Sequence, residues 1–253
     1  MSIKNIDLNC DLGEWRETKG AEKDARIMPF ITSCNIACGG HIGDEHSMQK
    51  TVELAIKNGV KIGAHPSFPD RENFGRKKLN IYPSRLFDSL CTQVRQLGEI
   101  VAQNGETLHH IKPHGALYNE AAKDEAIAEV IVNMVLKMFP GVPLYAPMGS
   151  MLDKIAAEFK VDIMYEAFAD RAYEDDLSLR PRALNGAVLH QTKDVLAQIE
   201  RMVIYGEVVT FSGLRKPISA QTICLHSDTE GSIRLAEEIY DYLKGRDVEI
   251  AAI

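Results

Sequence analysis

Residues that could carry out acid–base or metal chemistry gather at six points in the sequence, each at the end of a short apolar run. Five of the eight histidines lie in these groups, together with carboxylates and a lysine. A buried polar group without a partner costs about 1–3 kcal/mol, so we predict that the groups converge on one active site. They are Asp11-Leu-Gly-Glu14, Asn35-Ile-Ala-Cys-Gly-Gly-His41, Gly63-Ala-His65-Pro, His110-Ile-Lys112-Pro-His114, Glu166-Ala-Phe-Ala-Asp170-Arg171 and His226-Ser-Asp228.

Two chemistries suit these residues. Asp11, His65 and His114 are candidates for general acid–base catalysis, with Lys112 as a stabiliser of negative charge. Alternatively, Asp11, His41 and His65 could bind a divalent metal, because one carboxylate and two imidazoles leave a position open for water. The chain has no HExxH motif. We therefore predict a metal-free network and keep the metal at Asp11, His41 and His65 as the alternative.

Glycines before an expected helix indicate a second kind of site, for an anion. Gly39, Gly40 and Gly43 precede Asp44, and such a turn can present backbone N–H groups. The anionic Asp44 weakens this interpretation. Neither GxxxxGKS/T nor GxGxxG occurs in the sequence, so nothing supports a P-loop NTPase or a Rossmann dehydrogenase. The cations that could meet a carboxylate or a phosphate are Lys112, Arg76, Arg171 and Arg182.

Strand-like and amphipathic helix-like runs alternate along the whole chain. Such alternation favours a parallel sheet, either open or closed into a barrel. The expected helices cover residues 44–58, 84–104 and 127–138, and apolar stripes mark three more at 151–155, 195–202 and 233–239. The expected strands are Ile6–Cys10, Asn35–Cys38, Val60–Ala64, His109–Pro113, Pro143–Ala146, Ile163–Ala169, Ala187–Leu189 and Thr222–Leu225.

The alternation of side chains within these strands decides between the two architectures. Strands of an open parallel sheet are usually apolar on both faces. Here Asp7, Asn9 and Asp11 share one face of the first strand, opposite Ile6 and Leu8. Charged residues on one face of buried strands need a shared, hydrated or liganded space, which the mouth of a barrel supplies. We therefore predict a distorted β/α barrel of about seven or eight strands.

Composition narrows the class of protein. The chain has 253 residues and a net charge of −7, which argues against nucleic-acid binding. No apolar run approaches the roughly 18–20 residues of a membrane span, and residues 1–20 contain no apolar signal core. The five cysteines are odd in number and sparse, which indicates free thiols in a reducing compartment. We expect a cytoplasmic protein with one barrel domain over residues 1–253.

Two long loops follow strands that carry site residues. Residues 66–83 join a strand to a helix over 18 residues, where 2–6 are usual. Residues 171–182 form the second loop and contain several charged side chains. We predict that both act as lids over the site, with ordinary surface loops as the alternative.

Seven motifs, in order along the chain, carry a family resemblance. They are residues 7–14 (Asp-Leu-Asn-Cys-Asp-Leu-Gly-Glu), 35–39, 63–67, 74–76 (Phe-Gly-Arg), 112–119 (Lys-Pro-His-Gly-Ala-Leu-Tyr-Asn), 168–173 and 223–229. Together they resemble the LamB/YcsF family, the A subunits of prokaryotic ATP-hydrolysing 5-oxoprolinases. The resemblance implies a seven-stranded barrel of the glycoside hydrolase/deacetylase type. It also implies conversion of 5-oxo-L-proline, ATP and two waters to L-glutamate, ADP and phosphate.

The resemblance further implies ATP with Mg²⁺ as cofactor and a complex with B and C subunits. Asp11, His65, His114 and Lys112 are our catalytic candidates for this reaction. The alternatives are a stand-alone metal-dependent deacetylase-like hydrolase and a non-catalytic subunit that binds the lactam. The sequence departs from the family pattern at Gly40, Leu177 and Ser227, which bears on substrate specificity. The residues expected to bind the small-molecule substrate are Asn9, Asn35, His41, Arg76, Glu166, Asp170, Arg171, His226 and Asp228.

Overall fold

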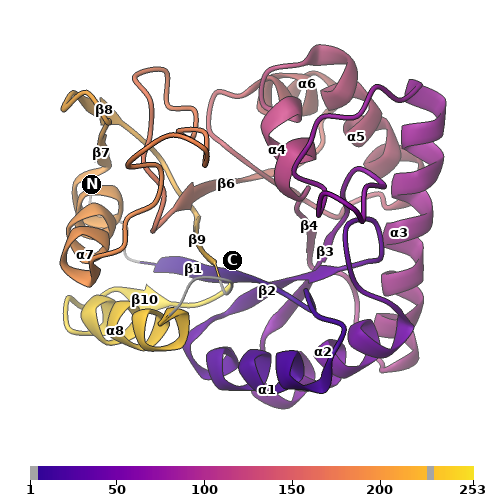
Figure 1. Ribbon diagram of the computed structural model, residues 1–253, viewed down its shortest axis with the longest axis horizontal. Helices are drawn as coiled ribbons and strands as arrows, with labels where there is room; N and C mark the ends of the chain where they lie inside the picture. The colour runs from indigo at the N-terminus through magenta and orange to yellow at the C-terminus, as the bar shows by residue number, and fades with distance from the viewer. Residues whose placement is uncertain (1–4, 227–230) are drawn as a thin grey trace.

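Seven parallel strands form a closed barrel at the centre of the molecule (Figure 1). The computed structural model describes residues 5–226 and 231–253. Around the barrel the strands follow the order β1-β2-β3-β4-β5-β6-β9, and β9 pairs back onto β1. They are β1 (Asn5–Leu12), β2 (Ser33–Ala37), β3 (Lys61–His65), β4 (His110–Ile111), β5 (Leu144–Ala146), β6 (Ile163–Phe168) and β9 (Thr222–His226).

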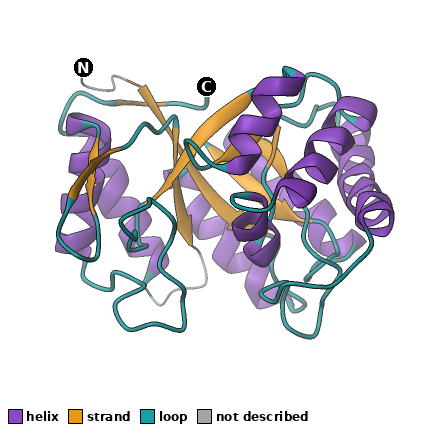
Figure 2. Ribbon diagram, turned by 90° about the horizontal axis from the view of Figure 1, so that it is seen from above, coloured by secondary structure: helices purple, strands orange, loops and turns teal. Residues whose placement is uncertain are grey.

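Helices surround the strands (Figure 2). They are α1 (Thr18–Ile27), α2 (Glu45–Asn58), α3 (Pro83–Gln103), α4 (Gly115–Ala121), α5 (Glu125–Met138), α6 (Met151–Phe159), α7 (Thr192–Glu200) and α8 (Ser232–Lys244), with short turns η1 (Met28–Phe30) and η2 (Arg201–Tyr205). Outside the barrel, β7 (Glu207–Val209) and β8 (Arg215–Pro217) form a hairpin, and β10 (Glu249–Ile250) pairs with the start of β1. Within the described residues, no helix is both long and apolar enough to cross a bilayer.

The predicted barrel is confirmed, but one predicted strand is wrong. Ala187–Leu189 forms no barrel strand. Its backbone pairs instead with the loop that follows β6, through the bonds Ala172 N–H to Ala187 O and Leu189 N–H to Asp170 O. Since the other seven strands already close the barrel, no edge is left for an eighth one there. Helices α1 and α4 and the β7–β8 hairpin are present in addition to the predicted elements.

The alternation predicted for the first strand is also confirmed. Ile6 and Leu8 belong to the apolar core between the barrel and the helices. Asp7, Asn9 and Asp11 are also buried, but their partners lie across the barrel interior. At the base of the barrel, the Asp7 carboxylate accepts hydrogen bonds from hydroxyl groups on four other residues, Thr32, Ser33, Tyr145 and Thr222. The interior is therefore a hydrogen-bonded polar column rather than an apolar core.

A glycine of β3 makes room for one part of this column. The Gly63 position is level with Asn35 of β2 and with His110 of β4. A Cβ atom at Gly63 would lie 2.1 Å from Nε2 of His110, far inside van der Waals contact. Glycine at this position thus lets the His110 imidazole fill the interior beside β3, where it stacks on the Tyr145 ring with 3.8 Å between centroids.

Helix α2, which the sequence predicts over residues 44–58, is capped at both ends. The Asp44 side chain accepts a hydrogen bond from the Ser47 backbone N–H, and the Ser47 hydroxyl accepts one from the Asp44 N–H, which forms a capping box. The helix ends at Gly59 in the left-handed conformation. This cap fixes the start of α2 directly after the segment that carries His41.

Replacing the cap tests this local account. Asp44→Ala should lower the free energy of unfolding by about 1 kcal/mol, because a helix N–H loses its acceptor. Asp44→Asn is the matched control and should stay within about 0.5 kcal/mol of the wild type, since asparagine caps as well as aspartate. Urea unfolding followed by circular dichroism measures both variants, and equal losses in the two would contradict the assignment.

Candidate functional site

A cluster of carboxylates and imidazoles lies at the carboxyl ends of β1, β3 and β4. Nδ1 of His114 is 3.0 Å from Nε2 of His65 and 3.3 Å from Oε1 of Glu14. Oδ2 of Asp11 lies 3.4 Å from the same His65 nitrogen. His41 stacks on the His114 ring, with 3.6 Å between centroids and 2° between planes. The structure therefore brings these strand ends together, and the contacts between their side chains are direct.

The second nitrogen of each central histidine fixes where its proton lies. Nδ1 of His65 is 2.8 Å from the Lys112 carbonyl oxygen, and Nε2 of His114 is 3.0 Å from the Phe74 carbonyl oxygen. A carbonyl oxygen can only accept a hydrogen bond, so both of these ring nitrogens carry protons. In the neutral rings, Nε2 of His65 and Nδ1 of His114 then carry lone pairs that face each other across 3.0 Å.

Burial keeps the His114 ring neutral. It lowers the pKa of His114 well below the usual value, and the neighbouring His41 and His65 lower it further. Burial also lowers the pKa of His41 well below its usual value. The neutral His114 ring therefore presents the lone pair of Nδ1 to Nε2 of His65 and to Oε1 of Glu14, and a cation at this point would be bound by all three atoms.

The donor set fits a divalent metal ion. Among the described residues, ligand atoms of Glu14, His65 and His114 all lie within 4.8 Å of one another. Two imidazoles and one carboxylate form a common catalytic metal set. Each histidine also donates its other N–H to a backbone carbonyl, as metal-binding histidines usually do.

This set differs from the one expected from sequence. The sequence favours a metal-free network, with a metal at Asp11, His41 and His65 as the alternative, but His41 points its Nε2–H at Oε1 of Glu14, 2.9 Å away. It therefore orients a ligand instead of acting as one, and its buried Nδ1 has no hydrogen-bond partner in the described part of the chain. Oδ1 of Asp11 is turned to Lys112. Glu14 and His114 thus take the place of Asp11 and His41 in the candidate ligand set.

Lys112 lies below the cluster as a fully buried cation. Its Nζ is 3.0 Å from Oδ1 of Asp11 and 2.8 Å from Oε1 of Glu166. It also donates to Sγ of Cys224 at 3.0 Å and lies 5.3 Å from the centre of the Phe168 ring. Burial alone lowers the pKa of Lys112, but the facing charges outweigh it, so this pKa lies well above its usual value. The amine is therefore protonated, and the carboxylates of Asp11 and Glu166 balance its positive charge.

The two asparagines expected to bind substrate lie beside this ion pair. Nδ2 of Asn35 donates to Oδ1 of Asp11 at 2.8 Å, and Nδ2 of Asn9 donates to Oε1 of Glu166 at 3.0 Å. Nε2–H of His110 donates to Oδ1 of Asn35 at 2.6 Å. In this structure both amides are fully buried and hold the carboxylates that face Lys112.

The remaining predicted residues lie farther out. Arg76 is exposed, with its guanidinium 4.9 Å from the centre of the Phe74 ring. Arg171 is buried and donates to the carbonyl oxygens of Ala187 and Arg180, which fixes the second long loop; burial lowers its pKa to about 10. Asp170 is buried beside it in sequence. The His226 backbone is level with Asp11, and Asp228 lies outside the described residues.

Sequence reasoning missed two residues of the site. Glu14 belongs to the first polar group, three residues after Asp11. Neither the acid–base set nor the alternative metal set predicted from the sequence includes it. Tyr118 packs edge-on against Phe168, with 5.6 Å between ring centroids, and these two form a small apolar cluster with Cys224. Tyr118 lies on α4, which the sequence pattern did not predict. The long loop at residues 66–83 supplies the Phe74 carbonyl to His114, and its action as a lid stays a prediction.

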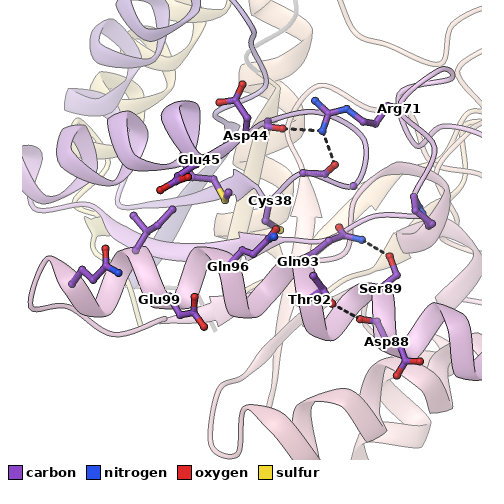
Figure 3. Close-up of a pocket in the computed structure, with 17 residues that line it drawn as sticks. Cys38, Asp44, Glu45, Arg71, Asp88, Ser89, Thr92, Gln93, Gln96 and Glu99 are labelled. Atoms are coloured by element: carbon purple, nitrogen blue, oxygen red, sulfur yellow. Dashed lines mark hydrogen bonds between the residues drawn. The ribbon is translucent and has the colours of Figure 1, made fainter.

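The glycine-rich segment borders a different space. A cavity of about 820 Å³ lies between the start of α2 and helix α3, lined by Gly39, Gly40 and Gly43 (Figure 3). Arg71 donates to the carbonyl oxygens of Gly39 and Gly43, and Asp44 caps its own helix. Four carboxylate residues line the cavity against this one arginine. It is therefore poorly suited to the anion expected there, and the metal-type cluster does not line it.

Both the sequence and the fold are similar to those of known proteins. The model of the LamB/YcsF family matches residues 6–253. A Brevibacillus brevis protein, named as the A subunit of 5-oxoprolinase, is 41% identical over 250 residues, covering 99% of this chain and 98% of the relative. The crystal structure of a lactam utilization protein from Thermus thermophilus superposes with a TM-score of 0.92 at 32% identity, covering 98% of this chain and 100% of that chain.

A more distant structure shares the fold alone. A putative cellobiose-phosphate cleavage protein from Enterococcus faecalis superposes with a TM-score of 0.60 at 14% identity, covering 99% of this chain and 97% of that chain.

Metal binding can be measured without any assay of activity. The wild type, stripped of metal, should bind near-stoichiometric Zn²⁺ in a calorimetric titration. Glu14→Gln and His114→Ala should each weaken the affinity by about 10–100-fold or more, because each removes a ligand. His190→Ala is the control and should leave the affinity unchanged, since His190 is an exposed histidine outside the cluster. No Zn²⁺ uptake by the wild type would remove the metal from the site.

Proposed function

The chain belongs to the LamB/YcsF family, and we propose that it is the A subunit of an ATP-dependent 5-oxoprolinase. In this role it would open the lactam ring of 5-oxo-L-proline to L-glutamate, coupled to hydrolysis of ATP to ADP and phosphate. The 41% identity to a protein of that name, over 99% of the chain, supports the assignment. The cluster of Asp11, Glu14, His65 and His114 at the barrel mouth is the observation that carries it, because it provides the groups that amide hydrolysis needs.

The chemistry of the substrate explains why ATP is needed. A five-membered lactam is an unstrained, resonance-stabilised amide, so its ring carbon is a poor electrophile. Phosphorylation of the lactam oxygen would make that carbon electrophilic, and water could then attack it. This step needs a base for the water and a group that stabilises the developing negative charge.

The positions of His65 and His114 suit the base role. Each presents one ring nitrogen to the same space, and the other nitrogen of each ring donates to a backbone carbonyl. Either nitrogen can take a proton from a water molecule at the cluster. Oδ2 of Asp11, 3.4 Å from the His65 nitrogen, can stabilise the imidazolium that forms. A divalent ion held by Glu14, His65 and His114 would occupy both of these nitrogens, and the cluster would then supply Lewis acidity and a more acidic water in place of a histidine base.

Lys112 and Arg76 have different parts in this scheme. Lys112 is enclosed by Asp11 and Glu166, so its main effect is to balance the negative charge of these carboxylates inside the barrel. Arg76 is exposed beside Gly75, whose Cβ would lie 3.0 Å from His41 and His114 atoms. It is the candidate to meet the substrate carboxylate or a phosphoryl group.

ATP binding is assigned to a complex rather than to this chain alone. The sequence has no P-loop, and its net charge is −7. Arg171 is engaged with the carbonyls of its own loop, which leaves few cations for a triphosphate with Mg²⁺. We propose that the B and C subunits contribute to the nucleotide site or deliver the activated lactam.

The Glu14, His65 and His114 cluster also favours a second candidate function. A metal-dependent hydrolase that acts alone on an amide or an acetyl group would use the same ligands without ATP. The two functions differ in their requirements. The first needs ATP and partner subunits, and the second needs only the metal.

Reconstitution tests the proposed function. The isolated chain should show little 5-oxoproline-dependent ADP release, and addition of the B and C subunits should restore it. In the complex, His114→Ala, His65→Ala and Asp11→Ala should each lower turnover by about a hundredfold or more, as expected for acid–base groups. His190→Ala, at an exposed histidine outside the cluster, is the matched control and should retain the wild-type rate.

Three results would contradict the proposal. Full coupled activity of the isolated chain would remove the need for partners. A wild-type rate in folded His114→Ala would remove the cluster from catalysis. Metal-dependent hydrolysis of acetylated substrates by the isolated chain, without lactam activity in the complex, would favour the second function.

A further inference from the structure

Glu14 lies outside the strands, on the turn that leads from β1 into α1. It follows the last residue of β1 by two positions. Its carboxylate nevertheless meets two separate groups, Nε2 of His41 at 2.9 Å and Nδ1 of His114 at 3.3 Å. Something other than the pairing of β1 must therefore fix this turn.

A buried carboxylate on α1 holds the turn on both sides of Glu14. Oδ2 of Asp24 accepts a hydrogen bond from the Gly13 backbone N–H at 2.9 Å and another from Nε1 of Trp15 at 2.8 Å. Asp24 is only 4% exposed. One oxygen atom thus binds the residue before Glu14 and the residue after it.

The packing around the turn leaves it little freedom. Gly13 has a positive φ of 71°, and a Cβ there would lie 3.2 Å from a methyl group of Ile36. The Trp15 side chain covers Gly20 of α1, where a Cβ would lie 2.2 Å from it, and its ring meets the edge of the His46 ring on α2. The turn therefore fits against α1 and α2 only when the Trp15 ring lies in this place.

We propose that Asp24 is a positioning residue for the active site: by binding Gly13 and Trp15 with one carboxylate oxygen, it aims the Glu14 side chain at His41 and His114. Asp24 acts through Glu14 and has no direct part in the chemistry of the proposed function. The kinetic part of the test rests on that proposed function, whereas the structural part does not.

The location of Asp24 is unfavourable for a carboxylate, which argues for a specific role. Burial raises its pKa to about 6, and the two hydrogen bonds lower it only in part. A buried carboxylate that merely filled space would be replaced by an apolar residue without loss. Here its ionised form makes two charge-assisted hydrogen bonds, and both of them end on the segment that carries Glu14.

Two variants separate positioning from packing. Asp24→Asn retains an oxygen that can accept from Gly13 and Trp15, whereas Asp24→Ala retains none. In Asp24→Ala, the Gly13 amide should exchange with deuterium at least about tenfold faster, because its acceptor is gone. The emission of Trp15, the only tryptophan in the sequence, should shift to longer wavelength. Asp24→Asn should stay close to the wild type in both measurements.

A double-mutant cycle shows whether Asp24 acts through Glu14. In the complex with B and C subunits, Asp24→Ala should lower kcat at least about tenfold, and Asp24→Asn should restore most of it. In a Glu14→Gln background, Asp24→Ala should lower kcat by less than about twofold, because its target is already lost. A general loss of stability would instead lower kcat equally in both backgrounds.

Each of these measurements has a result that would contradict the role of Asp24. Unchanged Gly13 exchange in Asp24→Ala, or equal effects of Asp24→Ala with and without Glu14, would overturn it. If Asp24→Ala does not fold, Trp15→Phe removes one of the two donors to Asp24, and a wild-type kcat in this variant would overturn the inference instead. If the wild-type complex lacks lactam activity, the proposed function fails, and the exchange measurement still tests Asp24.

Discussion

The charge of Lys112 inside the barrel is the interaction on which the site depends. A buried ammonium group would cost several kcal/mol if it stood alone. Here Asp11 and Glu166 face it at 3.0 Å and 2.8 Å, and Asn9 lies at 3.3 Å. Loss of one partner of such a pair typically costs about 3–5 kcal/mol. The geometry of Asp11, and through it that of His65, is thus set by the need to neutralise this amine.

The closed barrel makes that arrangement possible because residues that are far apart in the sequence lie at the same height along the barrel axis. Asp11 of β1 is level with Asn35 of β2, and Asn35 is level with Gly63 of β3. Below them, the Asp7 carboxylate is satisfied by hydroxyl groups of other elements. These polar side chains therefore find partners across the interior, and the column can remain without an apolar core. At the mouth of the barrel, above this column, the carboxylates and imidazoles are therefore held in fixed positions.

The mouth itself is built from the segments that follow the strands. The loop after β3 supplies the Phe74 carbonyl that fixes the proton of His114, and the turn after β1 supplies Glu14. Burial keeps His114 and His41 neutral, so the ring nitrogen that His114 presents to the cluster carries a lone pair. The strands therefore position Asp11, His65 and Glu166. The segments that follow the strands position Glu14 and the Phe74 carbonyl against His114.

The sequence by itself determined the barrel and the residues at its mouth. Alternation of Asp7, Asn9 and Asp11 with apolar neighbours required a polar interior, and the motifs identified the family. The tertiary structure alone decided the candidate ligand set, in which Glu14 and His114 take the place of Asp11 and His41. The tertiary structure also decided that Ala187–Leu189 pairs with the loop after β6 and forms no barrel strand. Periodicity reports which face of a strand a residue occupies. Distances between side chains from different strands depend on barrel closure and on the path of the connecting segments, which no local pattern encodes.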